Sequence, residues 1–175
     1  MSFDLTAVPG PADHSYPDSE VNPYPLLLRQ AQALLDDCSD LIAQMANISA
    51  LLYHGLPDLN WVGFYRRQGP AEQPVLVLGP FQGKVACVEI PWGKGVCGTA
   101  AATNSTQRVA DVHAFAGHIA CDAASESEIV IPVRLNGQVI AVLDIDSPIK
   151  DRFTAQDQQG LEQLVALLEA RQNAV

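Results

Sequence analysis

The stretch EIVIPVRLNGQVIAVLDIDS, residues 128–147, decides the fold of this chain. Two runs rich in β-branched residues face each other across Asn136-Gly137, the strongest short sequence signal for a two-residue hairpin turn. In the second run Asp144 and Asp146 alternate with apolar residues. Since successive side chains of a strand point to opposite faces of a sheet, both carboxylates should share one face. The stretch predicts an antiparallel hairpin with these two acids on a single face.

Strand-like composition continues on the N-terminal side of this hairpin. Three runs rich in β-branched and aromatic residues are separated by Gly, Pro and polar residues: NWVGFYRR (60–67), PVLVLGPF (74–81) and KVACVEIPW (84–92). The glycines and small residues of GKGVCGTAAATNS (93–105) indicate a turn that enters a short helix, and QRVADV (107–112) resumes the extended pattern. The sequence therefore predicts six strands, with one helix after the third.

Helical spacing precedes and follows these strands. Apolar residues from Leu27 to Leu52 recur at intervals of three, four and seven, which predicts one long helix or two helices broken at Asp36 to Asp40. Thr154 is suited to cap a last helix that runs to Arg171. This order of elements predicts an α+β domain, an antiparallel sheet with its helices on one side or at one end.

Composition limits the domain organisation and the partners. The first 25 residues carry five prolines and are expected to form an N-terminal arm, which leaves residues 26–175 as one domain. A net charge of -10 argues against nucleic acid or an anionic membrane as the main partner and favours a small ligand that carries an amine. Without a membrane-spanning run or a signal-peptide pattern, we expect a cytoplasmic protein with mostly reduced cysteines.

The cysteines are the first candidate group. Cys38 falls on the apolar stripe of the first helical region and is expected to be a buried structural thiol. Cys87, Cys97 and Cys121 each stand beside glycine or alanine, which would leave their sulfur atoms approachable for thiol exchange. Burial in the core is the alternative, above all for Cys87, which alternates with Val85 and Glu89 as in a strand.

Acidic and aromatic residues form the second and third groups. Carboxylates crowded together raise one another's pKa, so one of Glu128, Asp144 and Asp146 could hold a proton near neutral pH and donate it. An ionised carboxylate among them would instead bind a cationic amine. Alternatively, Asp144 and Asp146 have no functional role and simply lie on the solvent-exposed face of a half-exposed strand. The aromatic group consists of Trp61, Tyr65, Phe81 and Trp92, and each tryptophan is either a core residue or an apolar wall of a binding site.

These groups coincide in blocks that resemble the GAF-domain family of free methionine-(R)-sulfoxide reductases, from about Leu26 to Leu168. The resemblance implies a six-stranded antiparallel sheet flanked by helices, usually in a homodimer, that acts on free methionine sulfoxide. The blocks that carry it are NWVGFY, LGPFQGKVACVEI, GKGVCGTAAA, VADVHAFAGHIACDAASESEIVIPV and VLDIDSPIKDRF.

The resemblance also implies roles for the cysteines. Cys121 matches the nucleophile, which would become a sulfenic acid, and Cys87 matches the resolving thiol that then closes a disulfide. Cys97 matches a third site cysteine of less defined role. Thioredoxin, with NADPH and thioredoxin reductase behind it, would reduce the disulfide, and no bound metal or nucleotide cofactor is needed.

The remaining site residues follow from the same resemblance. Glu128, Asp144 and Asp146 would surround the substrate, with Trp61 against its methyl end. Glu128 or Asp146 would protonate the departing sulfoxide oxygen, and Asp144 would pair with the α-amino group.

Other interpretations stay open at this point. His118 is a candidate base or positioning group for Cys121, and Asp111 with His113 is a weak metal-ligand pair. A GAF module that binds a small molecule without turnover would have the same fold, although it has no need of approachable thiols. A structural zinc protein that uses the three cysteines of the middle third is a further alternative, which a metal analysis would reveal.

Overall fold

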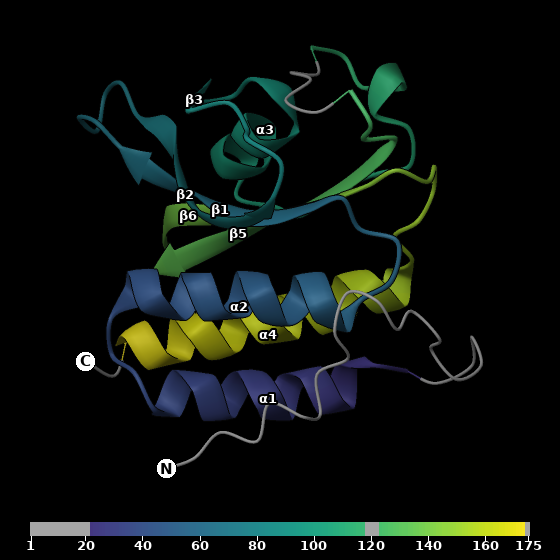
Figure 1. Ribbon diagram of the computed structural model, residues 1–175. Coiled ribbons are helices and arrows are strands. Elements are labelled where there is room, and N and C mark those ends of the chain that lie inside the picture. Colours follow the sequence, from purple (N-terminus) through teal and green to yellow (C-terminus); the bar gives the residue numbers. More distant parts are fainter. Residues whose placement is uncertain (1–21, 118–122, 174–175) are drawn as a thin grey trace.

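A computed structural model describes residues 22–117 and 123–173 of the protein (Figure 1). In this part of the chain six antiparallel strands form one sheet, in the order β3-β2-β1-β6-β5-β4. None of the helices described there is long and apolar enough to cross a membrane. The elements are α1 (Tyr24–Asp36), α2 (Leu41–Gly55), β1 (Trp61–Gln68), β2 (Val75–Gly83), β3 (Glu89–Pro91), α3 (Gly95–Thr103), β4 (Gln107–Val109), the 3₁₀ turn η2 (Val112–Ala114), β5 (Ser127–Leu135), β6 (Gln138–Ser147) and α4 (Ala155–Asn173).

The hairpin of β5 and β6 forms as the sequence predicts. Leu135 pairs with Gln138, and the two turn residues have positive φ angles, 51° at Asn136 and 79° at Gly137. This left-handed pair of residues is the type I′ geometry, whose twist matches that of the two strands. The register that follows places Glu128 opposite Asp146 at the far end of the hairpin.

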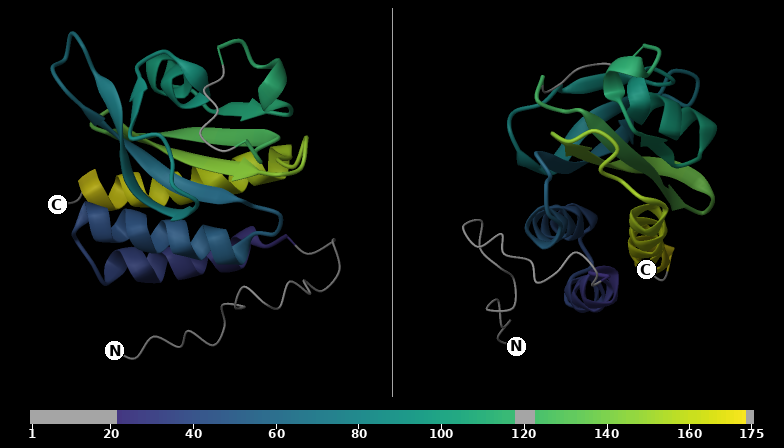
Figure 2. Two further views of the ribbon diagram at one scale, coloured as in Figure 1. Left: turned by 45° about the horizontal axis from the view of Figure 1, so that its top comes forward. Right: turned by 90° about the vertical axis from the view of Figure 1, so that its right-hand side faces the viewer.

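Helices cover both faces of the sheet, so the expectation that they lie on one side or at one end is wrong. Figures 1 and 2 show α2 and α4 against one face, α1 outside them, and α3 on the opposite face. The alternation of β6 explains this arrangement, because the strand has apolar residues on both faces. Leu143 and Ile145 belong to the core under α2 and α4, whereas Val142 packs in a second core with residues of α3.

The first helical region forms two helices, and its predicted start changes. The break expected at Asp36 to Asp40 is confirmed, and Asp40 caps α2 by accepting a hydrogen bond from the backbone N–H of Ala43. Cys38 lies in this connection and is half-buried, so its expected place on a buried helical stripe is wrong. The first helix also begins at Tyr24, with Pro25 in its first turn, where the missing N–H of proline has no intrahelical partner to lose.

The third run, KVACVEIPW, is the clearest difference from the predicted strands. Only its residues Glu89–Pro91 pair as β3, and Cys87 lies in the loop before it instead of alternating within a strand. Backbone carbonyls of this loop accept hydrogen bonds from side chains of β1, namely Trp61 and Tyr65. These bonds replace the ladder that a longer strand would have made.

Helix α1 is attached to α4 by one buried hydrogen bond. The Tyr24 hydroxyl donates to Oδ1 of Asp157 at 2.8 Å, while the other oxygen of Asp157 accepts from the backbone and hydroxyl of Thr154. Thr154 in turn accepts a bond from the Asp157 N–H, which confirms its predicted capping role. The Tyr24 ring lies where a Cβ at Gly160 would overlap it, so glycine is required there for α1 to pack this closely.

We expect Tyr24→Phe to lower the free energy of unfolding by roughly 1–3 kcal/mol, because it leaves a buried carboxylate oxygen without its donor. Tyr53→Phe is the matched control, since Tyr53 is half-buried against the same core. Urea denaturation of both variants measures the difference. Equal stability of the two variants would contradict the role given to the Tyr24 hydroxyl.

Candidate active site

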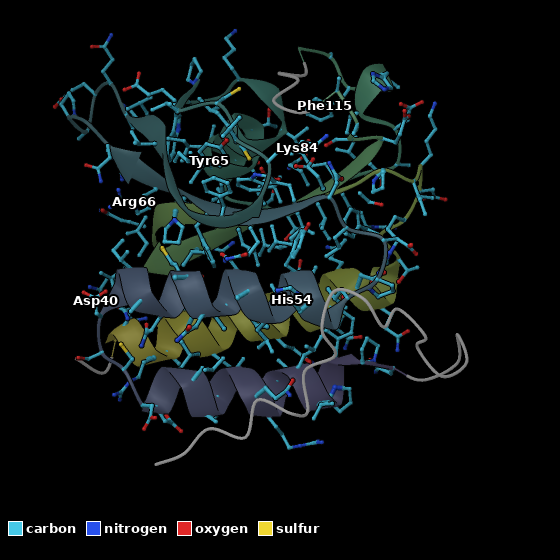
Figure 3. All side chains as sticks on the ribbon, viewed as in Figure 1. Asp40, His54, Tyr65, Arg66, Lys84 and Phe115 are labelled. Atoms are coloured by element: carbon cyan, nitrogen blue, oxygen red, sulfur yellow. The ribbon has the colours of Figure 1, made fainter. Side chains whose placement is uncertain are left out.

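The strand register brings three predicted site residues into one row on the face covered by α3. Glu128 of β5 stands opposite Asp146 of β6, and Asp146 stands opposite Trp61 of β1. Directly paired residues of antiparallel strands point to the same face. Asp144, two residues before Asp146, shares that face, and so does Tyr65, four residues after Trp61 on β1. Figure 3 shows Tyr65 above the sheet, on the side that carries α3.

Cys97 completes an acidic cluster from above. It lies on α3, and its thiol faces Oε1 of Glu128 at 3.9 Å. The sulfur of Cys97 and carboxylate oxygens of Glu128 and Asp144 all lie within 4.8 Å of one another. All three side chains are buried, with exposed fractions of 3% for Cys97 and 6% for each acid, whereas Asp146 is half-buried. The predicted crowding of carboxyl groups is therefore present.

Burial raises the pKa of each member of this cluster. Desolvation raises the pKa of Glu128 well above its ordinary value, and the negative charges of Asp144 and Asp146 raise it further. Desolvation also raises the pKa of Asp144, to about 6, against hydrogen bonds from Cys97 and Glu128 that lower it. Burial, followed by the charges of Asp144 and Glu128, raises the pKa of the Cys97 thiol. The site can therefore hold a carboxylic acid in its protonated form near neutral pH.

An aromatic wall adjoins the acids. The Trp61 ring stacks between Tyr65, at a centroid distance of 5.8 Å, and Phe81, at 5.4 Å. Gly63 makes this possible, because a Cβ there would approach the Trp61 ring to 2.5 Å. Only 3% of Trp61 is exposed, so its ring is largely a core residue that forms the floor of this face.

Cys87 is joined to the same face through Tyr65. The Tyr65 hydroxyl donates to the Cys87 carbonyl at 3.0 Å, and the Cys87 side chain packs against the core that contains Trp61, Tyr65 and Cys97. Cys87 is disulfide-bonded, whereas Cys38 and Cys97 have free thiols. The structure thus brings Cys87, Cys97, Glu128, Asp144, Asp146 and Trp61 to one face, while Cys121 and His118 lie outside the described residues.

One residue with a clear structural role, Gly63, was missing from the predicted site, and the bond from the aromatic candidate Tyr65 to the loop of Cys87 was not predicted. Tyr65 connects the acidic cluster to Cys87, and Gly63 leaves room for the indole of Trp61. The signal for both was the alternation of Trp61, Gly63 and Tyr65 along one strand, since every second residue shares a face. The bond between a tyrosine hydroxyl and a distant backbone carbonyl has no signature in the sequence.

Among the residues that the structure describes, two clusters have the side chains that could hold a metal ion. Cys97, Glu128 and Asp144 form one, but their raised pKa values make the deprotonation that a cation requires costly. In the other, His113 and Glu126 lie near Asp111, yet the Lys150 ammonium already bonds Oδ2 of Asp111 at 2.7 Å. Neither cluster is a strong metal site.

Comparison with known proteins places this arrangement in a family. A family model for the GAF domain matches residues 26–171. Over 146 residues the chain is 58% identical to the free methionine-R-sulfoxide reductase of Escherichia coli, which covers 83% of this chain and 86% of that protein. The chain belongs to the GAF-domain family of free methionine-(R)-sulfoxide reductases.

Solved structures of relatives superpose closely on this GAF domain. The structure of fRMsr of Staphylococcus aureus in complex with substrate is 51% identical, with a TM-score of 0.81 over 87% of this chain and 97% of that one. The free methionine-R-sulfoxide reductase of Neisseria meningitidis in complex with its substrate is 42% identical, with a TM-score of 0.81 over 86% and 89% of the two chains. The architecture of this GAF domain is therefore that of proteins crystallised with substrate.

We expect the buried acids to make stability depend on pH. Folded Glu128 and Asp144 bind protons more tightly than in the unfolded chain, so the free energy of unfolding falls as pH rises above the ordinary carboxyl range. The shift of Asp144 from 3.8 to about 6 alone corresponds to about 3 kcal/mol. Glu128→Gln removes one of the two titrations. As pH rises from about 4 to about 8, the free energy of unfolding of this variant should therefore fall less than that of the wild type.

Denaturant unfolding across this pH range measures the effect. Glu72→Gln, at an exposed position between β1 and β2, is the matched control and should run parallel to the wild type. If the curve of Glu128→Gln is parallel as well, Glu128 does not have the raised pKa described above.

Proposed function

We propose that this protein reduces free L-methionine-(R)-sulfoxide to L-methionine, with a dithiol protein such as thioredoxin as the electron donor. One observation carries the proposal: a buried group of acids, able to keep a proton, shares a face with a disulfide-forming cysteine. The relatives named above are free methionine-R-sulfoxide reductases or complexes with substrate, which supports the same reaction for this chain.

In the first step, the Cys121 thiolate attacks the sulfur of the sulfoxide. The sulfoxide oxygen must gain a proton as its bond to the methionine sulfur breaks, and Glu128 or the neighbouring Asp146 supplies it. Glu128 is the better donor, because burial and two neighbouring acids favour its protonated form. The hydroxyl passes from the substrate sulfur to the Cys121 sulfur as the bond between the two sulfur atoms breaks, so methionine is released and Cys121 becomes a sulfenic acid.

In the second step, the Cys87 thiol attacks the sulfenic acid, water departs, and a Cys87–Cys121 disulfide forms. The disulfide at Cys87 supports this pairing, because Cys38 and Cys97 are free and Cys121 is the fourth cysteine of the chain. A dithiol then reduces the disulfide and is itself oxidised. The balance is one sulfoxide and one dithiol converted to methionine, one disulfide and water.

Cys87 is a better resolving thiol than Cys97. Burial and the charges of Asp144 and Glu128 raise the pKa of Cys97, so its thiolate is scarce near neutral pH. The same surroundings suit Cys97 for donating a hydrogen bond to the acids, as its contact with Glu128 indicates. We therefore assign Cys97 to the support of the acidic cluster.

The acids and Trp61 also bind the substrate in this proposal. Oδ1 of Asp144 is buried and has no hydrogen-bond partner among residues 22–117 and 123–173, which makes it a ready acceptor for the α-ammonium group. Trp61 forms the apolar floor for the methyl end. Asp146 is paired with Trp61 in the register, two residues after Asp144 on β6. Recognition of a free α-amino group would exclude methionine within a peptide chain.

The wider setting follows from the family resemblance. We expect the protein to act as a homodimer in the cytoplasm, where thioredoxin keeps such disulfides reduced. The reaction requires no bound cofactor. A GAF module that only binds a small molecule is the alternative, and the disulfide at Cys87 is the observation that argues against it.

A coupled assay with thioredoxin, thioredoxin reductase and NADPH tests the function. The wild type should consume L-methionine-(R)-sulfoxide but not the S epimer, and Cys121→Ser should abolish consumption because it lacks the nucleophile. Cys38→Ser should cycle normally, which makes it the matched control. Turnover by Cys121→Ser at the wild-type rate would refute the nucleophile.

Single-turnover measurements test the resolving thiol. Cys87→Ser should release about one methionine per chain and then stop, because its sulfenic acid cannot close the disulfide. Cys97→Ser should continue to cycle with thioredoxin. The opposite result, cycling by Cys87→Ser and arrest of Cys97→Ser, would exchange the roles of the two cysteines.

A further inference from the structure

The loop that carries Cys87 exposes an unusual amount of apolar surface. Val85 is 89% exposed and Val88 is 67% exposed, the highest values for large apolar side chains among the residues that the structure describes. Both flank Cys87, which is itself half-buried. Exposed apolar side chains on both sides of a reactive group point to an interaction surface, because apolar surface left open to water favours aggregation.

The exposure belongs to a well-anchored loop. Trp61 Nε1 donates to the Lys84 carbonyl at 3.1 Å, Tyr65 donates to the Cys87 carbonyl at 3.0 Å, and the Leu78 N–H donates to the Val88 carbonyl at 2.9 Å. Three carbonyls in five residues are thus bonded to β1 and β2. Figure 3 shows Lys84, at the start of this loop, on the same side of the sheet as Tyr65. The fold therefore holds the two valines outward.

We propose that Val85 and Val88 form the docking surface for the dithiol protein that reduces the disulfide at Cys87. This inference rests on the proposed function, because it names the surface through which the catalytic cycle is completed. A thiolate must reach the sulfur of Cys87, so the partner has to press its own reactive cysteine against this loop. Val85 and Val88 are the first side chains that it meets on either side.

The size and charge of the surface favour this partner over others. Two valines are far too small for a stable dimer, which needs roughly 800 Å² on each subunit, but they suit the short contact of a redox encounter. A net charge of -10 disfavours an anionic membrane. Lys84 and Glu89, of opposite charge, border the loop, so apolar contact has to supply most of the docking energy.

The exchange then balances as follows. A thiolate of the dithiol attacks the sulfur of Cys87, a mixed disulfide forms, and the former partner of Cys87 leaves as a thiolate that takes up a proton. The second thiol of the dithiol attacks its own mixed disulfide and releases Cys87. Two electrons pass to the protein, and the dithiol becomes a disulfide.

Val85→Asp and Val88→Asp test the surface, with thioredoxin and dithiothreitol compared as reductants. We expect each variant to lose about tenfold or more in kcat/KM for thioredoxin and to keep wild-type turnover with dithiothreitol, which needs no docking surface. Ile42→Asp, another exposed apolar residue but on α2, is the matched control and should affect neither. An equal loss with both reductants, or no loss with either, overturns the proposal.

A second measurement separates this inference from the proposed function. The oxidised protein is mixed with reduced thioredoxin in the absence of any sulfoxide, and the rate at which its thiols appear is followed. Slower reduction of Val85→Asp and Val88→Asp than of Ile42→Asp supports the docking surface even if the substrate is a different molecule. Equal rates for all three variants overturn the docking surface even if sulfoxide reduction is confirmed.

Discussion

Two carboxyl groups buried beside a thiol under α3 are the constraint on which the rest of the site depends. Glu128 and Asp144 are each only 6% exposed, and their oxygens lie within 4.8 Å of one another and of the Cys97 sulfur. Two negative charges so close together and so poorly solvated are costly, so the site keeps a proton. In the proposed function, this proton goes to the departing sulfoxide oxygen.

Side chains of β1 connect this acid to the redox chemistry. Trp61 lies in register with Asp146, stacks on Tyr65, and donates to the backbone at Lys84. Tyr65 donates to the backbone at Cys87. The strand that lies under the acidic cluster therefore also fixes the loop of Cys87. In the proposed function, proton donation and disulfide exchange would share this one support.

Much of this arrangement could be predicted from local patterns. The Asn136-Gly137 turn and the alternation in VLDIDS fixed the hairpin and placed Asp144 and Asp146 on one face, as the register confirms. The strand expected around Cys87 was wrong, because side chains of β1 bond its backbone and end the ladder there. The position of α3 on the opposite face was also missed, because a strand with apolar residues on both faces does not reveal which helix covers which face of the sheet.

The proton on the acidic cluster is the central claim, and infrared spectroscopy of the carboxyl groups at neutral pH measures it directly. A protonated carboxylic acid has a C=O stretching band that a carboxylate lacks. We expect this band in the wild type near pH 7 and its loss in Glu128→Gln, with Glu72→Gln unchanged. A wild-type spectrum at that pH without a protonated carboxyl band would contradict the account.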